Sequence, residues 1–93
     1  MVKISLHSLT GNVVTLRLEG RLVDLWVTEV RKFCEQLLSD GRELILDLAN
    51  LSFCDSRGIT LLHELLDRRV RLVNCSPFLA GQIGEEGAGS HYF

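Results

Sequence analysis

The sequence predicts a single small α/β domain, in which an N-terminal hairpin and parallel strands form a mixed sheet of about four strands with helices packed against it. Three observations lead to this prediction. Apolar and polar residues alternate in the first part of the chain, which is typical of strands. Helix-like patterns then alternate with short apolar runs, which implies right-handed crossovers onto one sheet. The chain of 93 residues is long enough for one such domain but not for two.

The first two predicted strands form a hairpin. Val2, Ile4 and Leu6 alternate with polar residues, and the same alternation returns over residues 14–19. A period of two predicts strands that bury one face. The connection at residues 10–12 is short and contains Gly-Asn, so we expect a tight turn and antiparallel pairing.

An amphipathic helix is predicted after the hairpin. Asp24 is the preferred N-cap of this helix, with Thr28 as the alternative. Gly41 suits the left-handed position that commonly follows a helix end. The apolar residues between these two ends recur at spacings of four, three and four, which is typical of a helix that covers a sheet. We expect this stripe to lie in the core: Trp26, Val30, Phe33 and Leu37.

The remaining elements follow in alternation. Residues 43–48 form a nearly continuous apolar run, which is typical of a strand that is central in a sheet or covered on both faces. Residues 59–66 have helical spacing of apolar side chains, and residues 70–73 form a short fourth strand. Ser76 can cap a last helix, and Pro77 suits its first position.

The end of the chain differs from the rest in composition. Residues 84–93 contain three glycines and two glutamates, with no basic residue and no regular period. Such a segment has little apolar surface to bury. We therefore expect the folded domain over residues 1–83 and a flexible Gly-rich tail over residues 84–93.

Composition and charge argue against several classes of protein. The formal net charge is −2 and no basic block is present, so we expect no nucleic-acid binding. No apolar run approaches the ~20 residues that span a bilayer, and the N-terminus lacks the pattern of a signal peptide. We expect a cytoplasmic protein without membrane insertion. The three cysteines are widely spaced with no histidine at ligand spacing, so we expect reduced core thiols, no metal and no cofactor.

The most distinctive stretch lies between the apolar run 43–48 and the helix that follows. Asp55 and Ser56 are both good N-caps, and Gly58 allows the backbone to turn closely. The simplest interpretation is a capped helix start after a strand. A helix N-terminus also tolerates an anion, so a phosphate on Ser56 would add about −1.5 to −2 charges without unfolding the domain. Asp55 would oppose this charge and Arg57 could offset it, which would change the surface that a partner meets.

Catalysis at Ser56 is not supported by its surroundings in the sequence. A serine nucleophile needs a base within hydrogen-bond reach and an oxyanion hole. Ser56 does not lie in a Gly-x-Ser-x-Gly motif, and His63 would lie roughly 10 Å away along the helix. The Gly-rich phosphate-binding loops of nucleotide-binding enzymes are absent as well. We therefore expect a protein that is not an enzyme and has no catalytic residues.

Three segments together resemble a known family. They are Leu-Glu-Gly-Arg-Leu-Val-Asp at 18–24, Leu-Ile-Leu-Asp-Leu at 44–48 and Leu-Ser-Phe-Cys-Asp-Ser-Arg-Gly-Ile at 51–59. This combination is similar to a STAS domain, as in bacterial anti-sigma-factor antagonists, over about residues 2–83. The family pattern is Asp-Ser-Ser-Gly or Asp-Ser-Ala-Gly followed by an aliphatic residue, and its first serine matches Ser56.

The resemblance implies a regulatory function. The unphosphorylated antagonists of this family bind an anti-sigma factor, often itself a serine kinase, and phosphorylation of the matching serine weakens that complex. It therefore implies that Ser56 is phosphorylated and that the partner-binding residues are Asp55, Ser56, Arg57, Gly58 and Asp24.

One departure from the family pattern leaves an alternative open. Arg57 stands where the family usually has a small residue, and a long cation there could block a kinase or neutralise the phosphate. The alternative is a STAS scaffold without phosphorylation, or a subunit of a lipid-trafficking ABC transporter or signalling assembly, in which Ser56 is only a cap. A homodimer also stays open, because aromatic residues such as Phe53 and Trp26 could serve an interface.

Overall fold

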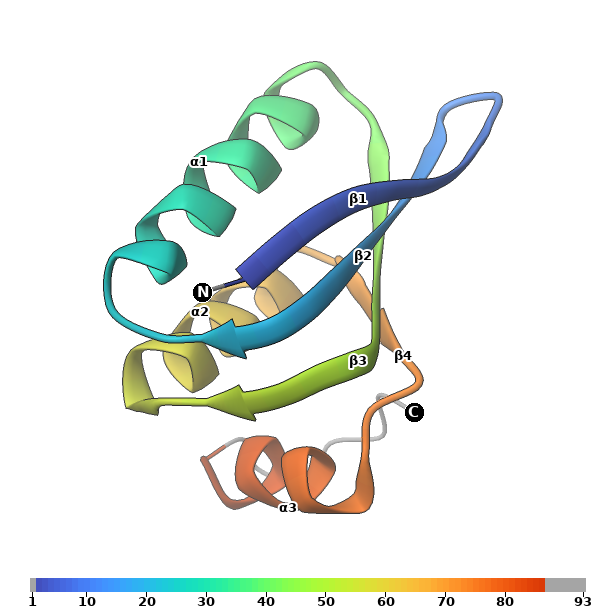
Figure 1. Ribbon diagram of the computed structural model, residues 1–93. Coiled ribbons are helices and arrows are strands. Elements are labelled where there is room, and N and C mark those ends of the chain that lie inside the picture. The colour runs from blue at the N-terminus through green and yellow to red at the C-terminus, as the bar shows by residue number, and fades with distance from the viewer. Residues whose placement is uncertain (1, 87–93) are drawn as a thin grey trace.

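The computed structural model describes residues 2–86, which form one mixed four-stranded sheet and three helices (Figure 1). β1 pairs antiparallel with β2, while β3 pairs parallel with both β2 and β4, in the order β1-β2-β3-β4. This confirms the predicted α/β domain with a hairpin and parallel strands. The elements are β1 (Val2–Thr10), β2 (Val13–Leu22), α1 (Leu25–Ser39), β3 (Glu43–Cys54), α2 (Ser56–Asp67), β4 (Arg71–Val73) and α3 (Pro77–Glu86).

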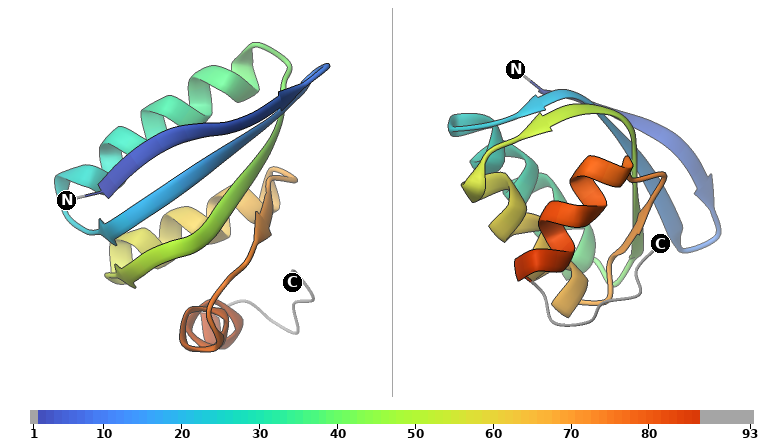
Figure 2. Two further views of the ribbon diagram at one scale, coloured as in Figure 1. Left: turned by 45° about the vertical axis from the view of Figure 1, so that its right-hand side comes forward. Right: turned by 90° about the horizontal axis from the view of Figure 1, so that it is seen from below.

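The core lies between the sheet and two parallel helices. α1 and α2 lie side by side across one face of the sheet, and α3 packs against α2 (Figure 2). The helix-facing side chains of the strands are almost all aliphatic and fully buried, and burial of this apolar surface drives folding. Leu16, Leu18, Leu46 and Leu48 come from the strands, and Val30, Leu61, Leu62 and Leu65 from the helices. No helix of the described chain is long and apolar enough to cross a bilayer.

The central strand is longer than the sequence predicts. β3 continues six residues beyond Leu48 to Cys54, and it stays paired with β2 to the end. The pairing shifts register twice on the way, so Leu48, Leu51 and Cys54 are buried at intervals of three and not of two. An alternation rule cannot detect such a strand. The extension carries the chain to Asp55, whose amide donates to the carbonyl oxygen of Leu22 at 3.2 Å.

Two apolar residues that the sequence places in the core are exposed. Leu6 is 62% exposed and Phe33 is 47% exposed. The pairing of β1 with β2 shifts register between Leu6 and Ser8, and the outer half of the hairpin does not pack closely against α1. Leu6, Leu9 and Phe33 therefore line a shallow hollow between the hairpin and the second half of α1. Trp26, in contrast, packs partly buried against the core as predicted.

A buried carboxylate joins β2, β3 and the end of β4. Asp47 is only 4% exposed and points to the sheet face opposite the helices. Its oxygens accept hydrogen bonds from Arg17 Nη2 at 3.2 Å, Asn74 Nδ2 at 3.1 Å and the Ala49 amide at 3.0 Å. Burial raises the pKa of this carboxyl, but the three donors and the charge of Arg17 outweigh burial and hold the pKa below its ordinary value.

The cysteines are packing residues. Cys34 and Cys54 are buried and Cys75 is partly buried, and none is in a disulfide. Burial raises the pKa of the Cys34 and Cys54 thiols to about 12 and that of Cys75 to about 11. Thiolates are therefore scarce at neutral pH, and these side chains act as small hydrophobic groups.

The same backbone motif ends α1 and α2, but with different residues. Gly41 follows α1 with φ +78°, as the sequence predicts, and Arg69 follows α2 with φ +66°. In each case two amides close the last turn, in the pattern of a Schellman motif. The bonds are Arg42 N to Leu37 O and Gly41 N to Leu38 O after α1, and Val70 N to Leu65 O and Arg69 N to Leu66 O after α2.

Arg69→Gly should raise the free energy of unfolding by about 0.5–1 kcal/mol. Relief of the left-handed conformation gains ~1–2 kcal/mol, and the greater chain entropy of glycine offsets about half of this gain. Gly41→Ala is the matched control and should have the opposite sign, because alanine is strained at φ +78°. Urea unfolding of both variants checks the pair. A loss of stability in Arg69→Gly would mean that the arginine side chain contributes more than its backbone strain costs.

α3 begins as predicted and extends beyond the predicted boundary. The Ser76 hydroxyl accepts a hydrogen bond from the Leu79 amide at 3.1 Å, which confirms Ser76 as the cap before Pro77. The helix continues to Glu86, three residues past the expected domain end at residue 83. The rest of the expected tail, residues 87–93, lies outside the described residues.

Candidate functional site

The strand-to-helix join forms a tight, capped turn. β3 ends at Cys54, α2 begins at Ser56, and Asp55 between them is extended with φ −80° and ψ −178°. Asp55 Oδ1 accepts a hydrogen bond from the Gly58 amide at 2.8 Å. This bond confirms that Asp55 is the N-cap, one of the two alternatives that the sequence leaves open. Ser56 is therefore the first helical residue, and it is exposed.

The second oxygen of Asp55 ties the join to the loop before α1. Asp55 Oδ2 accepts a hydrogen bond from the Asp24 amide at 3.0 Å. Asp24 occupies the N-cap position of α1, but its φ is +51° and its side chain makes no cap hydrogen bond. The prediction is thus right that Asp24 occupies the N-cap position and wrong that its side chain caps the helix. The positive φ gives the residue a conformation that N-caps do not normally adopt. Two predicted site residues, 31 positions apart, are brought into contact.

Asp55 is held in its charged form. Burial raises the pKa of this carboxyl. Hydrogen bonds from the amides of Gly58, Asp24 and Arg57, together with the nearby charge of Arg57, lower the pKa by more than burial raises it. The pKa therefore lies below its ordinary value. A fixed negative charge stands directly before the hydroxyl of Ser56 at neutral pH.

Asp55→Ala should lower the free energy of unfolding by about 1–2 kcal/mol at pH 7, because the variant loses the cap and the tie to Asp24. A carboxyl whose pKa is lowered by folding stabilises the protein above its unfolded pKa of about 3.9, and this contribution disappears as the pH falls through the folded pKa. The difference between variant and wild type should therefore shrink below about pH 4. Ser56→Ala is the control and should stay within about 0.5 kcal/mol, since Ser56 does not supply the cap bond. Equal losses in both variants would contradict this assignment.

Gly58 allows the start of α2 to approach the end of the sheet closely. It is buried, and a Cβ atom there would lie 2.4 Å from Cys54 Sγ and 2.8 Å from the Leu22 carbonyl oxygen. The predicted role of Gly58 in close backbone approach is therefore confirmed. Gly58 thereby helps to fix the position of Ser56 and Arg57, both of which are exposed.

A polar hollow lies beside Ser56, between the N-terminal halves of α1 and α2. It has a volume of about 210 Å³ and contains two arginines, one from each helix. The predicted site residues Asp24 and Arg57 lie on it. Its full lining is Asp24, Val27, Thr28, Arg31, Arg57 and Thr60.

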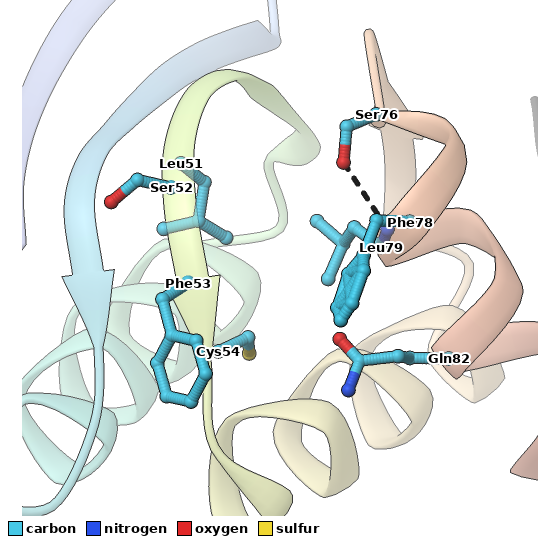
Figure 3. Close-up of a pocket in the computed structure, with 8 residues that line it drawn as sticks. All are labelled: Leu51, Ser52, Phe53, Cys54, Ser76, Phe78, Leu79 and Gln82. Carbon is cyan, nitrogen blue, oxygen red and sulfur yellow. Dashed lines mark hydrogen bonds between the residues drawn. The ribbon is translucent and has the colours of Figure 1, made fainter.

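An apolar hollow lies on the other side of the join, between the end of β3 and α3 (Figure 3). Its volume is about 320 Å³, and its two phenylalanines are exposed, Phe53 by 44% and Phe78 by 66%. The guanidinium of Arg21 lies 5.0 Å from the centre of the Phe53 ring. The sequence indicates Phe53 as an interface candidate but gives no such signal for Phe78, because a phenylalanine in a short apolar helix usually belongs to the core.

His63 is engaged far from the serine hydroxyl. Its Nε2 donates a hydrogen bond to the Ile83 carbonyl oxygen at 2.7 Å, which ties α2 to α3. The ring thus serves packing between two helices. It lies about two turns along α2 from Ser56, as the sequence spacing predicts.

The chain is similar to known proteins both in sequence and in fold. The family model described as STAS domain matches residues 8–83. The chain is similar to the anti-sigma factor antagonist SpoIIAA in its unphosphorylated form, with 28% identity, a TM-score of 0.69, and coverage of 91% of this chain and 84% of that one. It is also similar to the Bacillus cell fate determinant SpoIIAA in the phosphorylated form, with 27% identity, a TM-score of 0.68, and coverage of 94% and 86%. No curated protein matches the chain in sequence.

Proposed function

This chain belongs to the STAS domain family, and from that premise we propose that it is an anti-sigma-factor antagonist that binds an anti-sigma factor and is switched by phosphorylation of Ser56. One observation carries the proposal. Ser56 is exposed at the first position of α2, and the neighbouring Asp55, not Ser56, caps the helix. The serine hydroxyl is thus available for modification in a fold shared with an antagonist for which a phosphorylated form is known.

The physical chemistry of the site suits a switch that leaves the fold intact. A phosphate on Ser56 would sit at the positive end of the α2 dipole, which favours negative charge. It would also stand beside Asp55, whose cap bond holds the carboxylate charged. Phosphorylation therefore concentrates negative charge on the surface and leaves the buried core unchanged, so the partner would meet a different surface.

The proposed partner surface combines direct contacts with positioning residues. Ser56, Arg57 and Asp24 are exposed and would touch the partner. Asp55 and Gly58 would act by holding them in place, through the cap bond and the close approach to β2. The exposed phenylalanines of the apolar hollow adjoin this surface and would supply its apolar part.

The proposed partner is an anti-sigma factor that is also a serine kinase. Arg57 beside the acceptor would offset part of the phosphate charge. Asp24 and Asp55 would keep the site negatively charged after phosphorylation, even though Arg57 offsets part of the phosphate charge. A kinase surface that is anionic, or that fits the unmodified serine closely, would therefore bind the phosphorylated protein more weakly. The protein would act in the cytoplasm as a regulator without catalytic activity of its own.

The test is affinity purification from the native cell with wild type, Ser56→Ala and Ser56→Glu as baits. The proposal expects an anti-sigma factor with wild type and Ser56→Ala, and much less of it with Ser56→Glu. The matched control is Ser39→Glu, which adds the same charge at the exposed far end of α1 and should bind as wild type.

A second measurement tests the modification directly. Incubation with the recovered kinase and ATP should add one phosphate to wild type and none to Ser56→Ala, as measured by intact mass. Two outcomes together favour the alternative of an unphosphorylated scaffold or a lipid-transporter subunit. They are recovery of membrane permease subunits and undiminished binding by Ser56→Glu. The observation that favours this alternative is Arg57, a long cation beside the acceptor where the family usually has a small residue.

A further inference from the structure

Two interhelical ion pairs form a row along the surface beside Ser56. Arg31 of α1 pairs with Glu64 of α2, and Glu35 of α1 pairs with Arg68 of α2. The two helices run in the same direction, because each connects one strand of the sheet to a parallel neighbour. Cross-links between them therefore repeat about once per turn along both helices.

Ser56 lies on the same row, two turns before Glu64. Ser56, Thr60 and Glu64 are spaced by four residues and so occupy one face of α2. The Thr60 hydroxyl donates a hydrogen bond to the Ser56 carbonyl oxygen at 2.9 Å, and Thr60 lines the polar hollow with Arg31 and Arg57. Ser56 thus neighbours two residues that line the hollow, Arg57 in sequence and Thr60 through its hydrogen bond. Glu64 is about 12 Å further along the helix axis.

We propose that Arg57 and Arg31 together hold the phosphate of phosphorylated Ser56, and that Arg31 leaves Glu64 to do so. This inference rests on the proposed modification of Ser56 and adds an intramolecular receptor for it. The receptor is built from one arginine on each helix that flanks the serine.

The exchange of partners by Arg31 is favourable on charge and geometry. A phosphoserine carries about −1.5 to −2 charges and three acceptor oxygens, whereas Glu64 offers one charge and two. Arginine matches phosphate oxygens with two parallel donors. The existing bond is exposed on both sides, at 40% for Arg31 and 47% for Glu64, and solvent screens such pairs strongly. Asp24 lines the same hollow, and Asp55 accepts a hydrogen bond from the Asp24 amide and directly precedes Ser56. Both carboxylates oppose the phosphate, so one arginine alone would leave the site acidic.

The consequence is that the signal spreads beyond the serine. Glu64 would lose its partner and present a free carboxylate on the exposed face of α2. The cross-link between α1 and α2 would be broken at that turn. The negative charge that Arg31 neutralises at Ser56 would reappear at Glu64, so the exchange would move charge along α2 and would not remove it.

The test uses protein with phosphoserine installed at position 56 during translation, so that no kinase is required. In the unphosphorylated protein the hydrogen bond from Arg31 holds the pKa of Glu64 below its ordinary value. Carboxyl ¹³C NMR should show that phosphoserine raises the pKa of Glu64. In an Arg31→Gln background phosphoserine should add only the small direct effect of its charge. The same pKa of Glu64 with and without phosphate would overturn the proposal.

The phosphate itself gives a second and independent signal. Arg31→Gln and Arg57→Gln should each raise the second pKa of the phosphoserine by roughly half a unit, less than near a buried charge because the site is exposed. Glu64→Gln should lower that pKa, because it removes the competitor for Arg31. Arg71→Gln, on the exposed side of β4, is the control and should change nothing. If Arg31→Gln behaves like this control, the proposal fails.

These outcomes are separate from the test of the proposed function. A kinase that leaves Ser56 unmodified would remove the phospho-switch, and the NMR titrations would still report whether the two arginines hold a phosphate. A kinase that modifies Ser56, with titrations that match the control, would leave the switch standing and remove the arginine receptor.

Discussion

Gly58→Ala should lower the free energy of unfolding by about 1–3 kcal/mol, which is the usual cost of forcing an extra methyl group into a packed region. The added Cβ would lie 2.8 Å from the Leu22 carbonyl oxygen and 2.4 Å from Cys54 Sγ. The carbonyl is fixed, because it accepts the Asp55 amide that ends β3. The start of α2 would therefore have to move away from the sheet, which also displaces Ser56. Urea unfolding measures the loss of stability, and binding to the proposed partner should fall in parallel.

Gly81→Ala is the matched control for this prediction. Apart from its own chain neighbours and helix backbone, no atom lies within 4 Å of the Cβ position at Gly81, and that residue is inside α3. Alanine should therefore raise stability by about 0.5–1 kcal/mol, the ordinary helix preference over glycine. Adding Cys54→Ala to Gly58→Ala should recover only part of the loss, since the Leu22 carbonyl remains. A neutral Gly58→Ala variant would show that the helix start has room to shift.

Asp47→Ala should lower the free energy of unfolding by about 3 kcal/mol, the low end of the range for breaking a buried ion pair. The low end applies because the Arg17 side chain is still 32% exposed and can turn to water. Asn74 Nδ2 and the Ala49 amide would lose their acceptor as well. The network links β3 to β2 and to the residue that follows β4, so the sheet edge should open first. Hydrogen exchange of the β4 amides would report this directly.

The carboxylate of Asp47 should also make the free energy of unfolding depend on pH. Its pKa is below the ordinary value in the folded protein, so its contribution is present above about pH 3.9 and is lost as the pH falls through the folded pKa. Asp47→Asn should therefore unfold more easily than wild type at pH 7 and differ less from it at low pH. The control is Asp67→Ala, an exposed residue at the end of α2 that should change stability by less than about 0.5 kcal/mol. A pH-independent difference for Asp47→Asn would contradict the role of the charge.

The fold was predictable from local patterns for a physical reason. Alternation in β1 and β2 and helical spacing in α1 and α2 reflect which face of each element meets the core, and that constraint is written along the chain. The helix ends were also predictable where one residue type determines the backbone, as at Gly41 and Ser76. The prediction was wrong where distant contacts override the pattern. Leu6 and Phe33 fit their stripes, yet the hairpin leaves them exposed.

The candidate site divides in the same way. Residue types at positions 55–58 were enough to predict a capped helix start, because caps depend on bonds within one turn. The sequence could not decide that Asp55 is the cap, or that its second oxygen binds the amide of Asp24. That bond joins residues 31 positions apart and depends on the positive φ at Asp24. The polar hollow with Arg31 and Arg57 likewise exists only because α1 and α2 lie in parallel.

Local chemistry thus determined the order of the elements, the core stripes of β2, β3 and α2, and the strand-to-helix join that holds Ser56. The tertiary structure alone decided how far β3 extends, which carboxylate caps α2, and which charged groups surround the serine. The physical reason is range. Hydrophobic periodicity and capping act over one or two turns, whereas the register shifts, the bond from Asp24 to Asp55 and the ion pairs between helices join segments that meet only after the chain has folded.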